Sequence, residues 1–350
     1  MQIKIEKLVC GGKGAGYVEG KIVFVPLSAP GDILDIEITA DHGSFAEGSI
    51  KTVLEPSVDR VKPECPVFGS CGGCQWQHLS YETQLSWKKK ILQESLERIA
   101  KIANPDVDDT LASPLHWNYR NRIQLHVSKT GKVGFHRTKS REIIEFDRCL
   151  IADDRINYEL SERREEFRKR DRGISLRVEK GPAFIQVNTA QNEQVGKIIV
   201  DWMRSVAHSF VLELYAGAGN FTFQIAKIAD RVVASDVDKN AISLAKKTAL
   251  SLGAGNVEFI ASHSAKAAGR MKGRCDAVFL DPPRKGAASA LPDIVKLSPE
   301  NIFYMSCDPA TMARDVRFLS SSGYRFVKSL PIDMFPQTFH LESLTRLEKA

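Results

Sequence analysis

The sequence predicts an α/β protein with a small N-terminal β-barrel, a central α+β domain and a doubly wound, Rossmann-like C-terminal domain. Residues 1–56 contain short β-rich runs separated by Gly and Pro, as in small barrels. Residues 57–175 combine clustered cysteines, an amphipathic helical stretch and a basic hairpin pattern. Residues 176–350 alternate apolar runs with helical stretches, which is typical of a mostly parallel sheet covered by helices.

The composition favours a cytoplasmic globular protein. Of the 350 residues, 43% are hydrophobic, and no apolar run approaches the ~20 residues that span a bilayer. The start, MQIKIEKLVC, lacks the apolar stretch of a signal peptide. We therefore expect no membrane contact and no structural disulfides, so the seven cysteines need a metal-binding or catalytic explanation. The net charge of +6 permits a polyanionic partner without requiring one.

The first domain should be a small barrel. We expect β-structure in Tyr17–Pro26, Asp32–Thr39 and Gly48–Leu54. The glycines of Gly11–Gly16 could suggest a nucleotide-binding loop, but no strand–turn–helix surrounds them, so tight turns are the favoured interpretation. The succession GxGxG, VFVP and PGD resembles the TRAM domain, an RNA-binding barrel. The balance of 5 Lys/Arg against 8 Asp/Glu in residues 1–56 does not itself favour RNA binding.

The central domain opens on three cysteines within ten residues, Cys65, Cys71 and Cys74, set among Gly and Pro. Zinc sites and iron–sulfur cubanes usually take four protein ligands. Cys149 is the best fourth ligand and Cys10 the reserve. The C-x5-C-x2-C run differs from the paired CxxC of zinc ribbons, which favours an iron–sulfur cluster and leaves zinc open. The remaining alternative is a set of unrelated buried cysteines.

The rest of this domain should hold two helices and a basic hairpin. Ser80–Ala100 has helical spacing with Ser80 as N-cap, and we interpret Lys88, Lys89 and Lys90 as a solvated face. A charged helix is expected over Ser161–Arg172. Residues 118–141 contain seven Lys/Arg and no acid, interleaved with aromatic and His side chains. A hairpin of this kind can hold phosphates and stacked bases, although an ordinary solvated hairpin is the alternative. The candidate RNA contacts are Arg120, Arg122 and Arg137.

The C-terminal domain is expected to be built from alternating strands and helices. The expected strands are Phe210–Tyr215, Arg231–Asp236, Val257–Ala261, Asp276–Leu280 and Ile302–Met305, closed by an antiparallel pair over Phe326–Met334 and His340–Leu347. The expected helices are Thr222–Ile228, Lys239–Leu252, Leu291–Leu297 and a helix from Thr311 onward.

One end of this sheet has the features of a cofactor site. Gly217 and Gly219 form a G-x-G turn between strand and helix, without the third glycine of dinucleotide sites. Asp236 ends the next strand, where a carboxylate can bind ribose hydroxyls. The arrangement is similar to the cofactor site of S-adenosylmethionine-dependent methyltransferases, and a dehydrogenase is the less favoured alternative.

Further chemistry-bearing residues follow later strands. Asp281–Gly286 (DPPRKG) has Arg284 where amino-methyltransferases carry an aromatic, so a cation is available there for a phosphate or a base. Cys307 stands at the end of the strand Ile302–Met305, before Pro309. It is either an inert buried thiol or a nucleophile. Glu342 is an acid within a strand-like run.

Together these motifs resemble the S-adenosylmethionine-dependent RNA uracil-5-methyltransferases, in the branch with a TRAM domain and an iron–sulfur cluster. The resemblance covers almost the whole chain. Its most specific motifs are DPPRKG, SCDPATMARD and FPQTFHLES, preceded by GKGAG, the cysteine run with Cys149, FIQVN at Phe184–Asn188 and LELYAGAGNFT. Three departures, Asp308 for Asn, Gln337 for His and Ala216 for Cys, leave the catalytic positions intact.

The resemblance implies a mechanism and a set of site residues. Cys307 would add to C6 of uracil, and Glu342 would remove the C5 proton after methyl transfer, with His340 as the second-ranked base. Cofactor residues would be Gln186, Tyr215, Gly217, Asn220, Asp236 and Asp281, with Ser262 or His263 at the adenine. Ligands of a [4Fe–4S] cluster would be Cys65, Cys71, Cys74 and Cys149.

The predicted function is therefore methylation of C5 of a uridine in RNA. The resemblance favours 23S ribosomal RNA, with Arg284 as a fourth RNA contact. A uridine in the transfer-RNA T-loop is the alternative substrate. A non-catalytic RNA-binding or ribosome-assembly factor is the alternative of another class. No obligate protein partner is inferred.

Overall fold

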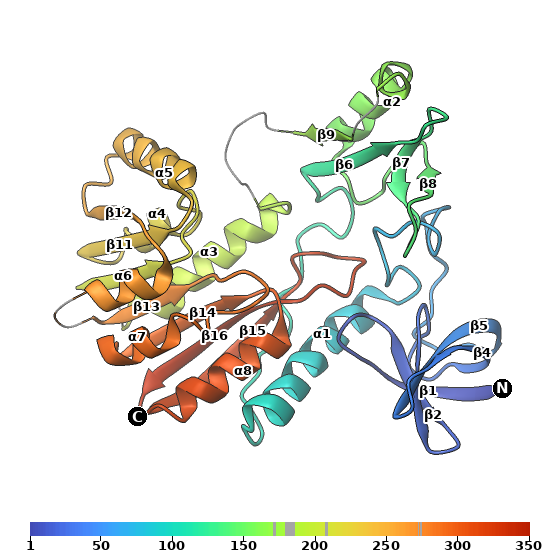
Figure 1. Ribbon diagram of the computed structural model, residues 1–350, viewed down its shortest axis with the longest axis horizontal. Helices are drawn as coiled ribbons and strands as arrows, with labels where there is room; N and C mark the ends of the chain where they lie inside the picture. The colour runs from blue at the N-terminus through green and yellow to red at the C-terminus, as the bar shows by residue number, and fades with distance from the viewer. Residues whose placement is uncertain (171–172, 179–185, 207–208, 272, 274) are drawn as a thin grey trace.

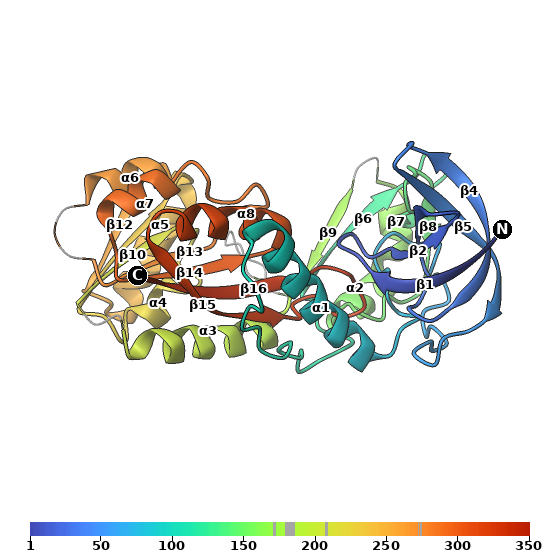
Figure 2. The same cartoon turned by 90° about the horizontal axis from the view of Figure 1, so that it is seen from below.

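In the computed structural model, described for residues 1–170, 173–178, 186–206, 209–271, 273 and 275–350, the chain forms a barrel, a central sheet and a seven-stranded C-terminal sheet. The barrel and the C-terminal sheet lie at opposite ends of the molecule, with helix α1 (Tyr81–Ser95) between them (Figure 1 and Figure 2). Among the described residues, no helix combines the length and the apolar character needed to span a bilayer.

The predicted N-terminal barrel is confirmed. Its strands close in the order β1-β2-β3-β5-β4. They are β1 (Gln2–Leu8), β2 (Gly14–Val18), β3 (Lys21–Val25), β4 (Ile33–Asp41) and β5 (Phe45–Glu55). The single run expected over Tyr17–Pro26 is wrong, because Glu19 and Gly20 both take positive φ (50° and 78°) and turn the chain between β2 and β3.

The central sheet has the order β8-β7-β6-β9 and confirms the hairpin. Its strands are β6 (Arg122–Val127), β7 (Val133–His136), β8 (Ile143–Glu145) and β9 (Ile174–Arg177). Helix α2 (Asp154–Arg168) starts earlier than expected, because Asp153 caps it by accepting from the N–H of Arg155 at 2.9 Å. Residues 171–172, at the end of the expected helix, lie outside the described residues.

The C-terminal sheet confirms the doubly wound prediction, with the order β12-β11-β10-β13-β14-β16-β15. Its first five strands are parallel, and β16 pairs antiparallel with both β14 and β15. The strands are β10 (Phe210–Leu214), β11 (Arg231–Asp236), β12 (Val257–Ala261), β13 (Ala277–Leu280), β14 (Asn301–Ser306), β15 (Tyr324–Ile332) and β16 (Glu342–Lys349).

Helices cover both faces of this sheet (Figure 2). The helices are α3 (Thr189–Arg204), α4 (Thr222–Ile225), α5 (Lys239–Leu252), α6 (Ser264–Arg270), α7 (Leu291–Leu297) and α8 (Pro309–Ser320). Residues of α3 and α4 share one core with the sheet, and residues of α6, α7 and α8 share another. The sequence interpretation missed α3 and α6.

Helix α1 packs into the C-terminal domain although it follows the cysteine segment in the chain. Its Leu92 shares one core with Tyr304 of β14 and Met312 of α8. Ser80 caps it as predicted, accepting from the N–H of Thr83 at 3.2 Å, and Leu96–Ala100 continues it as a π-helical turn. The boundaries at residues 56 and 175 stay predictions, but a large part of residues 57–175 shares its core with the domain that follows.

The interpretation of Lys88 as part of a solvated face is wrong. Its side chain has no exposed surface, and its Nζ lies 2.5 Å from Oδ1 of the equally buried Asp333. Tyr81 donates its hydroxyl proton to the other oxygen of Asp333 at 2.8 Å. The residue faces inward because α1 lies against the C-terminal sheet, and helical spacing alone could not reveal this contact.

Candidate active site

The two predicted catalytic residues lie at the same end of the C-terminal sheet. Ser306, the last residue of β14, pairs with Ser343 of the antiparallel β16. Cys307 directly follows Ser306, and Glu342 directly precedes Ser343. Their charges are close enough for Glu342 to raise the pKa of the Cys307 thiol. The register thus brings together a thiol and a carboxyl that are far apart in the sequence.

Burial and neighbouring acids raise the pKa of both groups at this edge. Burial, then Glu342 and Asp281, raise the pKa of Cys307 to about 11. Burial, then Asp281, raise the pKa of Glu342 to about 8. Arg284 lowers both values, which makes it the cation that favours ionisation of the thiol and the carboxyl.

Asp308 fixes the turn that carries Cys307. Its Oδ1 accepts from the N–H of Thr311 at 2.8 Å and so caps helix α8. Its own N–H donates to Oγ of Ser306 at 3.1 Å. Cys307 therefore directly precedes the cap of a helix N-terminus, where the helix dipole favours an anion. The departure from Asn at position 308 preserves a good capping residue.

His340, the second-ranked base, lies at the same edge. Its Nδ1 is 3.4 Å from a guanidinium nitrogen of Arg284, and its ring centroid lies 4.4 Å from that of the tilted ring of Phe339. Burial, then Arg284, lower the pKa of His340 to about 4. Because a guanidinium can only donate, the adjacent Nδ1 is held as an acceptor. A base this weak is less suited than Glu342 to removing a carbon-bound proton.

The predicted cofactor residues are brought together in one cavity of about 850 Å³. All six line it: Gln186, Tyr215, Gly217, Asn220, Asp236 and Asp281. Ser262 and His263 also line it, so the adenine contact stays open between them. Of the FIQVN motif, Phe184 and Ile185 lie outside the described residues. Tyr215 and Gly217 both take positive φ (63° and 56°), which turns the backbone toward the cavity.

Asp236, Asp238 and Asp281 line this cavity, and Glu213 lies behind the lining near two of them. Asp236 accepts from the N–H of Gly217 at 2.9 Å and from that of Asp238 at 2.8 Å, which orients its carboxylate. Burial raises the pKa of Asp281 to about 7. Glu213 on β10, which the sequence interpretation missed, is 2% exposed, and burial, then Asp281 and Asp236, raise its pKa to about 8. Such an acidic site suits a cofactor that carries positive charge.

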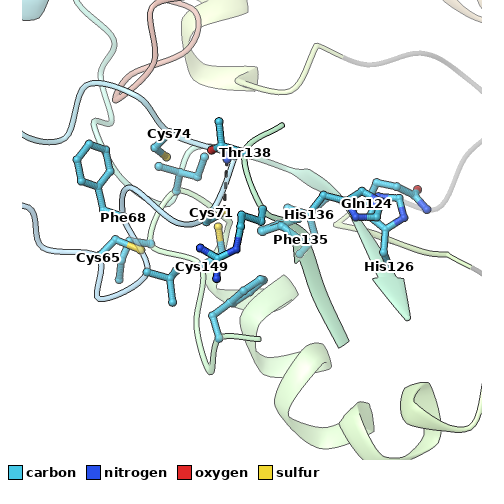
Figure 3. A pocket seen from close by; sticks show the side chains of 18 of the residues that line it. Cys65, Phe68, Cys71, Cys74, Gln124, His126, Phe135, His136, Thr138 and Cys149 are labelled. Atoms are coloured by element: carbon cyan, nitrogen blue, oxygen red, sulfur yellow. Dashed lines mark hydrogen bonds between the residues drawn. The ribbon is translucent and has the colours of Figure 1, made fainter. Parts of the chain in front are cut away.

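The clustered cysteines line a second cavity, of about 780 Å³. Cys65, Cys71, Cys74 and Cys149 all contribute to its wall and none is in a disulfide (Figure 3). Burial raises the pKa of Cys74 to about 12, with further increases from Cys149, Cys71 and Cys65. Cys10 is exposed and lies near Asp308 instead. The structure thus brings together the predicted four and leaves out the reserve.

The four cysteines supply the number of thiolates that a cubane cluster takes. Within the described part of the chain, no three His, Cys, Asp or Glu side chains converge as ligands of one metal ion. In a cubane each thiolate binds a different iron, so the sulfurs need not meet at one atom. The described lining contains no Asp or Glu and includes Arg120 and Arg148, which suits an anionic group.

The predicted RNA contacts lie around the cysteine cavity of the central domain and at the catalytic edge of the C-terminal sheet. Arg120 and Arg137 line the cysteine cavity beside the rings of His126 and His136, which are tilted by 31° with centroids 3.9 Å apart. Arg137 is ion-paired with Glu142 at 2.6 Å. Arg122 lies on β6 outside this lining, and Arg284 lies at the catalytic edge. Arg120 also lowers the pKa of His340, so it lies between the two places.

Comparisons with known proteins agree with this geometry. A family model described as tRNA (uracil-5-)-methyltransferase matches residues 155–350, and a TRAM domain model matches residues 1–51. An uncharacterized RNA methyltransferase of Aquifex aeolicus is 30% identical, covering 99% of this chain and 98% of its own. The 23S rRNA (uracil(1939)-C(5))-methyltransferase RlmD of a Marinomonas species is 29% identical, covering 99% and 94%.

One solved structure has the same fold over the whole chain. It is the Pyrococcus abyssi tRNA (uracil-54, C5)-methyltransferase in complex with S-adenosyl-L-homocysteine, with a TM-score of 0.77 and 24% identity over 99% of this chain and 100% of that one. The three-part architecture is therefore shared as a whole.

Proposed function

The chain belongs to the tRNA (uracil-5-)-methyltransferase family of S-adenosylmethionine-dependent enzymes, and on this premise we propose that it methylates C5 of a specific uridine in 23S ribosomal RNA. The observation that carries the chemistry is the proximity of Cys307 and Glu342 at one edge of the sheet, where the charge of Glu342 raises the pKa of the Cys307 thiol. It supports a nucleophile and a base acting on one substrate ring.

The reaction requires an electron-rich C5, and Cys307 supplies it. Once the thiol has lost its proton to solvent, its thiolate would form a bond from Sγ to C6 of uracil, and the C5–C6 π electrons would move toward C5 and O4. Bound S-adenosylmethionine would supply the methyl group to C5. Glu342, ionised to the carboxylate, would then remove the C5 proton, so that the C5=C6 bond re-forms and the thiolate leaves.

The cofactor would bind in the acidic cavity beside this edge. Asp236 would hold the ribose hydroxyls, and Gly217 would let the backbone approach the ligand. Asp281 lines the cavity and also raises the pKa of both Cys307 and Glu342. It therefore lies between the cofactor cavity and the catalytic edge of the sheet. The acidic surroundings would favour the positive charges of the cofactor.

The four cavity cysteines would hold a [4Fe–4S] cluster. The placement of four cysteines from two separate segments in the wall of one cavity, beside Arg120 and Arg148, supports this assignment. In this proposal the cluster is structural or positions RNA, and the residues of the methyl-transfer step are those at the sheet edge.

The substrate would be an unpaired or flipped uridine, because the two faces of a stacked base are not accessible to a thiol and a carboxylate at once. Arg120, Arg122, Arg137 and Arg284 would contact the flanking RNA. The nearly full-length match to the Marinomonas ribosomal RNA enzyme supports 23S rRNA as the substrate. The methylation would take place in the cytoplasm.

The test uses the full chain, S-adenosylmethionine and RNA that contains 5-fluorouridine, whose C5 has no proton to remove. A covalent protein–RNA complex should form and should be absent in Cys307→Ala. Methylation of unmodified 23S rRNA, but not of unmodified tRNA, would support the ribosomal substrate, and the reverse would assign the tRNA T-loop. No complex with either RNA would favour a non-catalytic RNA-binding factor.

A further inference from the structure

The segment that leads to Glu342 is held by contacts with distant parts of the chain. We define the base loop as Asp333–Leu341, between β15 and β16. Lys88 forms its ion pair with Asp333 at the start of this loop. Lys88 also donates to the carbonyl of Phe335 at 3.3 Å, and the hydroxyl of Tyr119 donates to the carbonyl of Pro336 at 3.1 Å.

Gln337 is the most constrained residue of this loop. It takes a φ of +68°, which L side chains rarely adopt, and it is only 5% exposed. Its carbonyl accepts from the N–H groups of both Gln75 (3.1 Å) and Trp76 (3.0 Å). Those two residues directly follow Cys74, so the cysteine segment is bonded to the base loop.

Gln84 of helix α1 holds the same residue from another side. Its Oε1 accepts from the N–H of Gln337 at 3.0 Å, and its Nε2 donates to Oε1 of Gln337 at 3.1 Å. The same Nε2 lies 3.2 Å from the carbonyls of Trp76 and Leu79. Gln84 is 1% exposed, so these bonds form away from water.

The barrel contacts this assembly through its glycine-rich turn. Trp76 donates its ring N–H to the carbonyl of Gly12 at 3.0 Å. A Cβ added to Gly12 would meet the side chain of Phe339 at 2.7 Å, so the barrel turn lies directly against the base loop. The cysteine segment, α1 and the barrel thus meet at one short loop.

We propose that Gln84 and Gln337 are positioning residues for the proposed base Glu342, linking the cysteine segment and α1 to the loop that carries it. The proposal rests on the proposed function, because it assumes that Glu342 acts after methyl transfer. Glu342 is the first residue of β16, opposite Ile332, so the conformation of the loop sets where its carboxyl enters the site. A shift of about 1 Å at a reacting group can cost roughly 100-fold in rate.

The test separates proton removal from the earlier steps. Gln84→Leu removes both bonds to Gln337, whereas Gln337→Leu removes only the side-chain bond and keeps the backbone contacts. With 5-fluorouridine RNA, where no proton is removed, both variants should form the Cys307 complex at the parent rate. With uridine RNA, turnover should fall by about 10- to 100-fold in Gln84→Leu, less in Gln337→Leu, and a methylated covalent complex should accumulate.

Gln93→Leu on the same helix is the matched control, because the amide of Gln93 donates to Glu97 one turn away on the exposed side. It should leave both reactions unchanged. Equal slowing of both reactions in the Gln84 and Gln337 variants would indicate general damage and overturn the proposal, as would unchanged turnover. Failure of the parent protein to form any complex would instead refute the proposed function.

Discussion

Cys307 directly follows Ser306, the last residue of β14, and Glu342 directly precedes Ser343, the residue of β16 with which Ser306 pairs. Both residues therefore lie where β14 ends and β16 begins, at one edge of the sheet. Binding sites in such sheets lie at this edge. The proximity is reflected in the raised pKa of the Cys307 thiol, to which Glu342 contributes.

Replacement of the proposed base should stop the reaction after methyl transfer. Glu342→Gln keeps the size of the side chain but cannot take up the C5 proton, so we expect a methylated RNA–protein complex on ordinary uridine RNA, visible by denaturing electrophoresis. Turnover should fall by about 100-fold or more. Glu348→Gln, on the same strand and away from the edge, is the control. Product release at the parent rate in Glu342→Gln would exclude Glu342 as the base.

The pH dependence of complex formation should depend on Arg284. Because the pKa of Cys307 is raised to about 11, the thiolate fraction increases as the pH rises from 6 to 9, and the rate should rise with it. Arg284→Met removes a cation that lowers the pKa of Cys307. The profile of complex-formation rate against pH should therefore shift to higher pH by up to about one unit.

The readout for Arg284 is the rate of complex formation on 5-fluorouridine RNA at saturating RNA. Arg317→Met, on the exposed side of α8, serves as the control. An unshifted profile with only a higher KM would assign Arg284 to RNA binding alone.

The buried ion pair of Lys88 and Asp333 should stabilise the folded protein. Lys88→Met leaves the carboxylate of Asp333 buried without its cation, which should lower the free energy of unfolding by about 3–5 kcal/mol, measured by urea denaturation. Lys89→Met removes the neighbouring pair with Asp109, whose carboxylate is 98% exposed, and should change stability little. Similar losses in the two variants would contradict the buried role of Lys88.

Cofactor affinity should depend on Asp236. Asp236→Asn removes the charge of the acceptor proposed for the ribose hydroxyls. The binding free energy should weaken by roughly 1.5–3 kcal/mol, the value of a hydrogen bond to a charged group. The dissociation constant of S-adenosylhomocysteine, measured by calorimetry, should rise by roughly 10- to 150-fold. Asp230→Asn, an exposed acid just before β11, is the control. An unchanged affinity in Asp236→Asn would remove the residue from the binding site.

Metal content should follow the four cavity cysteines. Anaerobic purification should give a brown protein with about four irons per chain, and Cys149→Ala should lose most of them. Cys10→Ala and Cys275→Ala should keep the iron, because neither residue lines the cavity. Stoichiometric zinc in place of iron would overturn the cluster assignment.

Local patterns were sufficient to predict much of the fold. The alternation of strands and helices after residue 176 predicted the doubly wound sheet, and the glycine-separated runs before residue 56 predicted the barrel. Helix α3 was missed although Val195, Ile199 and Met203 recur every four residues and are buried on one face. Helix α6 is rich in small residues and gives a weaker signal.

The sequence by itself determined the chemistry that is present: the thiol at Cys307, the acid at Glu342, the G-x-G turn and the four cysteines. Residue types and short spacings are local properties, and they can be recognised without the fold. Only the tertiary structure decided that Cys307 lies near Glu342, that Lys88 is buried against Asp333 and that Gln84 holds Gln337. These contacts join residues up to 253 positions apart. They depend on strand register and helix packing, which residue patterns along the chain do not specify.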